Sequence, residues 1–225
     1  MNKRLLALLG GGVLLGAVLL GAAWRLREGA QQTWGPPTAL PQTLTPQGYP
    51  SLGYETAPLD LFLYEDFASP QSKRLHDETE PLVVQQYVAH NLIRLVSIPI
   101  AAVSQDSYRA AEAALCAARA GRYWAFRDVL YAQQGKKPFT RENLALWAEQ
   151  VGIDRQRFYA WYDLDQCRDP VRQWNEMAKG KGVTGAPTLE IVGLGLIPGF
   201  RPFDDPDMPG VRQILDGALL EVMSK

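Results

Sequence analysis

The stretch FASPQSKRLHDET, residues 67–79, decides the fold because it marks the point where a buried strand gives way to a helix. The apolar run Leu59 to Tyr64 comes just before it and suits a buried strand. Ser69 is a favoured N-cap, and Pro70 suits the first helical position. The sequence therefore predicts a helix of about twenty residues that starts at Ser69 and bends at Pro81.

Further apolar patterns extend this unit in both kinds of secondary structure. Residues Asn91 to Val103 form a second apolar run, so a strand, a helix and a parallel strand are expected in that order. Residues 188–192 and 196–200 flank a glycine-rich turn and indicate an antiparallel hairpin. Helices are predicted at 107–120, 123–133, 141–151, about 155–163, about 170–179 and 211–222. This order describes an α/β fold, a thioredoxin-like core that carries a helical insertion.

Composition limits the function classes. The chain has 225 residues, a formal net charge of −1, 47% hydrophobic and 21% charged residues, which is typical of one globular domain with an appendage. No basic run of useful length is present, and we expect no nucleic-acid partner. No arrangement of metal-ligating residues suggests a metal site, and no cofactor is expected.

The N-terminal segment predicts a membrane anchor. Residues Leu5 to Trp24 lack charges, and a helix of that length roughly matches a hydrocarbon core of about 30 Å. We read residues 1–27 as a transmembrane signal anchor, so that the protein is a single-pass cell-membrane protein with its domain on the extracytoplasmic side. A cleaved signal peptide is the alternative. Residues 28–56 are proline-rich and read as an extended linker, which places the folded domain at 57–225.

Three segments resemble the DsbA-like thiol-disulfide oxidoreductases. Ala57-Pro58 followed by LDLFLYEDFASPQSKRLHDETEPL resembles that family's opening, in which an apolar strand leads into Cys-Pro-x-Cys. The segment GVTGAPTLEIVG resembles the family's Gly-Thr-Pro-Thr loop, whose proline peptide bond is cis and which faces the active cysteines. AAEAALCAARAGRYWAFRDVLYAQQ and FTRENLALWAEQVGIDRQRF are similar to its helical insertion, here about 104–180. The resemblance covers roughly residues 50–222 and implies a central mixed sheet.

The sequence departs from this family where the chemistry belongs. Ser69 and Ser72 fall on the two cysteine positions, and a hydroxyl cannot form a disulfide. We therefore assign no certain catalytic residue. The resemblance implies a binding site for unfolded or extended protein clients, formed by Ser69, Gln71, Ser72, Ala186, Pro187 and Thr188, which favours a noncatalytic, redox-inactive module of chaperone type.

Other interpretations of these residues stay open. Ser69 can be a helix cap alone, and Pro187 can be kept only for the angle at which its strand enters the sheet. The serines also resemble those of kappa-class glutathione transferases, in which a serine binds the thiolate of glutathione. A hydrolytic pairing of Ser72 with His76 lacks a recognisable orienting carboxylate, and His76 and His90 read as ordinary surface or core histidines. A scaffold for a membrane partner is a further reading.

The two cysteines, Cys116 and Cys167, can form a bridge if the domain is extracytoplasmic. A structural disulfide is the favoured reading, with buried inert thiols or a relocated reactive pair as alternatives. Glu190 is expected on the solvated face of its strand, with a buried acid near the site as the alternative.

Overall fold

The computed structural model describes residues 40–164 and 167–224. The expected anchor at Leu5 to Trp24 lies outside these ranges. Within them, no helix combines the length and the apolar character needed to cross a membrane.

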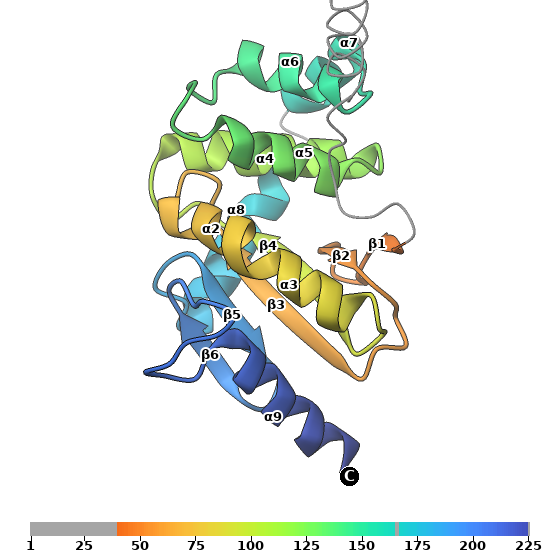
Figure 1. The fold of residues 1–225 in the computed structure, drawn as a ribbon. Coiled ribbons are helices and arrows are strands. Elements are labelled where there is room, and N and C mark those ends of the chain that lie inside the picture. The colour runs from red at the N-terminus through yellow and green to blue at the C-terminus, as the bar shows by residue number, and fades with distance from the viewer. Residues whose placement is uncertain (1–39, 165–166, 225) are drawn as a thin grey trace, which may run out of the picture. The chain divides into compact units, whose positions relative to one another are not determined.

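A six-stranded mixed sheet forms the centre of the domain, in the order β1-β2-β4-β3-β5-β6 (Figure 1). β3 (Leu59–Glu65) and β4 (Ile93–Pro99) are parallel, as predicted, and pair from Leu59 with Ile93 to Glu65 with Pro99. β5 (Thr188–Ile191) is antiparallel to β3, and β6 (Gly195–Pro198) completes the predicted hairpin. Because β3 and β4 lie at the middle of the sheet, both are apolar along most of their length.

Two short strands within residues 40–56 join the sheet, so the prediction of an extended linker over 28–56 is wrong for this part of the chain. β1 (Gln42–Leu44) pairs with β2 (Pro50–Leu52), and β2 pairs with β4 through Ser51 and Leu52. Ser51 and Leu52 are buried. Pro50 fits because it stands at the first position of a short strand, where no ladder hydrogen bond is lost.

The helical segment after β3 runs without a break from residue 70 to residue 88. It comprises α2 (Pro70–Arg74), η1 (Leu75–Thr79), α3 (Glu80–Val83) and η2 (Val84–Val88). η1 and η2 are turns of wider, π-helical hydrogen bonding. Pro81 is the second residue of α3, directly after η1. Because proline has no N–H to donate, it interrupts the regular helical hydrogen bonds at this point.

Helices cover the two faces of the sheet. Leu61, Leu63 and Leu189 face η1, α3 and α9 (Val211–Met223). On the opposite face Tyr64 meets Met177 of α8 (Arg168–Gly180). Figure 1 shows α9 crossing the sheet on the same side as α3.

The remaining helices form the insertion predicted between β4 and β5. They are α4 (Gln105–Arg119), α5 (Tyr123–Gln133), α6 (Arg141–Gln150) and α7 (Arg155–Tyr162), followed by α8. Thr140 caps α6 through the N–H of Asn143, as its position before the apolar stripe predicts. The insertion packs on the edge of the sheet at which β3 and β4 end, and α5 runs above the start of α2 (Figure 1).

Candidate functional site at the start of helix α2

The site is built where β3 ends and α2 begins. Ser69 is the N-cap of α2, and its Oγ accepts a hydrogen bond from the Ser72 N–H at 3.2 Å. The same Oγ donates its proton to the carbonyl oxygen of Ala186 at 2.9 Å. The Ala186–Pro187 peptide bond is cis, as the resemblance implied. Two segments 117 residues apart in sequence therefore meet through one serine hydroxyl.

The predicted binding residues gather here but differ in exposure. Ser69, Ser72 and Thr188 are buried, Ala186 is half-buried, and Gln71 is exposed. Thr188 Oγ1 donates to the Gly185 carbonyl at 2.8 Å and braces the loop that carries the cis bond. Gln71 and Ala186 thus supply the accessible surface, while the other side chains hold the two segments together.

Asp66 holds the two loops that flank the site by hydrogen bonds to their backbone N–H groups. Its Oδ1 accepts from the Ala68 N–H at 2.8 Å, and its Oδ2 accepts from the N–H groups of Ala102 and Val103 at 2.7 and 2.8 Å. Its own N–H donates to Ser72 Oγ at 3.3 Å. The segment after β4 is therefore a loop whose N–H groups are bound by side chains, by Asp66 and at Ala101 by Asn175, which explains why the predicted strand to Val103 ends at Pro99 instead.

The bond to Ala186 bears on the glutathione reading of Ser69. A serine that stabilises a bound thiolate must donate its hydroxyl proton to that sulfur. In this structure the proton of Ser69 is donated to Ala186, and the residue is only 4% exposed. The arrangement fits a cap and clasp rather than a thiolate-binding group.

The hydrolytic pairing of Ser72 with His76 is not formed. His76 Nδ1 lies 2.8 Å from Asp77 Oδ1, and its Nε2 lies 3.0 Å from Asp128 Oδ1. Both ring nitrogens are thus engaged by carboxylates, and neither is left to take a proton from Ser72. Burial alone would lower the pKa of His76, but the hydrogen bond to Asp128 and nearby carboxylates raise it above its ordinary value.

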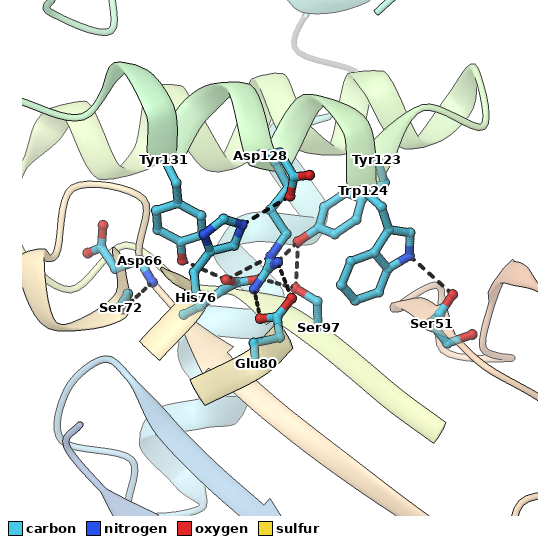
Figure 2. A network of polar contacts seen from close by, with 12 residues as sticks. Ser51, Asp66, Ser72, His76, Glu80, Ser97, Tyr123, Trp124, Asp128 and Tyr131 are labelled. Carbon is cyan, nitrogen blue, oxygen red and sulfur yellow. Dashed lines mark hydrogen bonds and ion pairs between the residues drawn. The ribbon is translucent and has the colours of Figure 1, made fainter. Parts of the chain in front are cut away.

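A buried charge network beside the site was not foreseen from the sequence (Figure 2). Arg127 of α5 binds Glu65 at the end of β3 through Nε at 2.7 and 2.9 Å, and it binds Glu80 through Nη1 and Nη2 at 2.7 and 2.5 Å. Tyr131 donates to Glu65 at 2.6 Å, and Ser97 donates to it as well. Glu65 is fully buried, and Arg127 is 1% exposed.

This network fixes the ionisation of Glu65. Burial alone would raise the pKa of Glu65, but the Arg127 guanidinium and the hydrogen bonds from Ser97 and Tyr131 hold it below its ordinary value. The carboxylate is therefore charged and fully bonded, and it ties β3 to α5. A signal existed in the sequence, because Tyr123, Arg127 and Tyr131 follow one another at i, i+4 and i+8 on one face of α5.

The cysteines and Glu190 lie away from the contact between Ser69 and Ala186. Cys116 and Cys167 form a disulfide across a sequence separation of 51, and both residues are buried. The expected disulfide between these two cysteines is confirmed. Glu190 is half-buried, between the two expected settings: its side chain is 15% exposed, pairs with the exposed Lys181 at 2.7 Å and accepts from Tyr64 at 2.5 Å.

Within residues 40–164 and 167–224, no group of three or more His, Cys, Asp or Glu side chains is placed to hold a metal ion.

The sheet order, the helical insertion and the helix start facing a cis-proline loop define a thioredoxin-like fold of the DsbA type. A family model described as thioredoxin matches residues 45–195. The chain belongs to this thioredoxin family.

Solved structures share the fold at low sequence identity. A thioredoxin-like oxidoreductase from Silicibacter pomeroyi DSS-3 superposes with a TM-score of 0.65 at 23% identity, over 80% of this chain and 95% of that one. Oxidised BdbD from Bacillus subtilis gives a TM-score of 0.68 at 16% identity, over 84% of this chain and 97% of that one.

A curated relative is a larger protein. The Na(+)/H(+) antiporter NhaA of Herminiimonas arsenicoxydans is 31% identical over 190 residues, which is 80% of this chain. The chain spans 28% of the length of that relative.

Proposed function

We propose that this protein is a noncatalytic, membrane-proximal thioredoxin-fold module that binds extended segments of client proteins beside the cis-proline loop. One observation carries the proposal. Ser69 occupies the helix start and hydrogen-bonds Ala186 directly, so the contact between helix and loop is kept while oxygen stands where the resemblance places sulfur. A hydroxyl cannot enter thiol-disulfide exchange.

The chain offers no free thiol elsewhere for that reaction. Its two cysteines are joined to each other, and Cys116 and Cys167 are 0% and 3% exposed. A relocated redox pair needs a sulfur that a substrate can reach, together with surroundings that lower its pKa. The buried bridge supports a structural role and leaves binding as the function of the serine site.

The surface at the site suits an extended peptide. Gln71 and Ala186 are accessible on either side of the Ser69 clasp, and β5 begins directly after the cis bond. β5 itself is paired on both sides, by β3 and β6, so the backbone available to a peptide in the manner of an added strand is that of the loop before it. The predicted anchor at Leu5 to Trp24 and the similarity to a protein named as an antiporter support a place beside the membrane.

Photo-crosslinking of the full chain tests the binding site. We expect p-benzoylphenylalanine introduced at the exposed Gln71 to capture a reduced and alkylated unfolded client, whose sulfurs cannot react. The control position is Arg172, which is 64% exposed on α8. Capture that is equal at the two positions, or absent at both, would contradict the binding site.

An exchange assay tests the loss of chemistry. The wild-type chain and its Cys116→Ala/Cys167→Ala variant should not reduce insulin, whereas Ser69→Cys/Ser72→Cys should, because the helix start lowers a thiol pKa. If the restored pair has an ordinary thiol pKa and shows no exchange, the inference that this is the family's site is wrong. Exchange by the chain without Cys116 and Cys167 would contradict the noncatalytic assignment.

A further inference from the structure

A groove opens next to the serine site, on the side of the helical insertion. It has a volume of about 380 Å³. Its lining includes Ala68, Val103, Gln134, Lys136, Lys137 and Pro138. Ala68 is the neighbour of Ser69 in the chain, and consecutive Cα atoms lie about 3.8 Å apart. A chain segment bound at the cis-proline loop would therefore lie next to the wall of this groove that Ala68 forms.

Both rims of the groove are fixed to the start of α2. On one side the Gln134 side-chain N–H group donates to the carbonyl oxygens of Phe67 and Ser69 at 2.6 and 3.1 Å. On the other side the Asp66 carboxylate holds the N–H groups of Ala102 and Val103. A groove whose walls are already ordered loses little conformational entropy when it is occupied.

The groove combines an exposed apolar side chain on one rim with uncompensated positive charge on the other. Val103 is 57% exposed, although it is a β-branched apolar residue held in place by Asp66. Lys136 and Lys137 are exposed on the opposite rim, and neither has an ion-pair partner among the described residues. Asp106 also lines the groove, but it is paired with Arg109 at 3.0 Å.

From these observations we infer that the groove selects clients carrying an acidic side chain next to an apolar one. The apolar side chain covers Val103, and the carboxylate lies between Lys136 and Lys137. This inference rests on the proposed function, since it names the class of segment that the module binds. Charge complementarity at an exposed rim gives selectivity and a salt-dependent on-rate more than raw affinity.

Two fluorescent peptides test the selectivity by anisotropy with the full chain. One contains two glutamates next to a valine in an otherwise uncharged extended sequence, and its twin has glutamines in their place. We expect the glutamate peptide to bind about fivefold more tightly at low salt, because two exposed ion pairs contribute modestly, and the difference to vanish at high salt.

Matched variants locate the effect. Lys136→Gln/Lys137→Gln removes two positive charges from the rim, and Arg122→Glu changes the net charge by the same amount at an exposed position outside the groove. The first variant should bind both peptides equally, and the second should keep the preference. Val103→Asp should weaken the binding of both peptides, because it puts a charge where their apolar side chain makes contact.

The outcomes separate the two proposals. If neither peptide binds, the proposed function fails. If both peptides bind equally to the wild-type chain, or if the lysine variant keeps the preference, the module binds clients but this groove does not select acidic ones.

Discussion

Replacing Arg127 with methionine removes the guanidinium that Glu65 and Glu80 share. The substitution keeps a flexible side chain of similar reach, so the main loss is the charge. Glu65 is 0% exposed and Glu80 is 12% exposed, and only Glu80 can turn partly towards water. Removing one partner of a buried ion pair leaves an uncompensated charge, which costs about 3–5 kcal/mol. We expect the free energy of unfolding to fall by that amount at pH 7.

The dependence on pH identifies the cause of the loss. In the wild-type protein the pKa of Glu65 lies below its ordinary value of 4.5, so its stabilisation is present above that value and is lost as the pH falls through the lowered pKa. Without Arg127, burial raises the pKa of Glu65 instead. The variant therefore loses least stability when Glu65 is protonated. The difference in free energy of unfolding between the wild type and the variant shrinks as the pH falls.

Urea unfolding followed by tryptophan fluorescence between pH 4 and pH 8 measures this deficit. Arg141→Met is the control, because Arg141 and Asp163 also form a close pair, at 2.5 Å, but both side chains are more than 40% exposed. The control should shift the midpoint little. In a Glu65→Gln/Arg127→Met variant much of the lost stability should return. A deficit below about 1 kcal/mol, or one that does not vary with pH, would refute the reasoning.

Two further predictions concern the bridge and the cap. Cys116→Ala/Cys167→Ala should lower the free energy of unfolding by about 4 kcal/mol in the chain-entropy model, because the bridge closes a loop with a sequence separation of 51. Urea unfolding with and without reductant measures this loss. A reductant-treated wild type that stays as stable as the oxidised form would contradict the prediction. Ser69→Ala should cost about 1–2 kcal/mol by removing the cap of α2 and the clasp to Ala186, and an unchanged unfolding midpoint would show that neither bond contributes.

Most of the fold follows from local signals. The apolar runs that became β3 and β4 are long enough to be buried on both faces, and the helices of the insertion carry apolar stripes with caps such as Thr140. The boundary of the domain was not predictable in this way. β2 has three residues and starts with Pro50, so it shows no alternation, and its burial depends on pairing with β4 far along the chain.

In the site, too, the local features were predictable from the sequence and the long-range contacts were not. The cap at Ser69 is local and was predicted, whereas its contact with Ala186 followed only from the resemblance, because it joins segments 117 residues apart. The charge network needs three elements to converge. Glu65 and Arg127 are 62 positions apart, and a single sequence shows the charges without showing that they meet in the core.

The bridge between Cys116 and Cys167 also governs how the protein responds to a pulling force. A load applied at the two ends of the chain passes from α4 to α8 through the covalent S–S bond, so α5, α6 and α7 lie in a bypassed ring. At about 3.4 Å per residue, this ring withholds roughly 170 Å of extensible length until the bond is reduced. The redox state of the bridge would therefore set how far the polypeptide lengthens under tension.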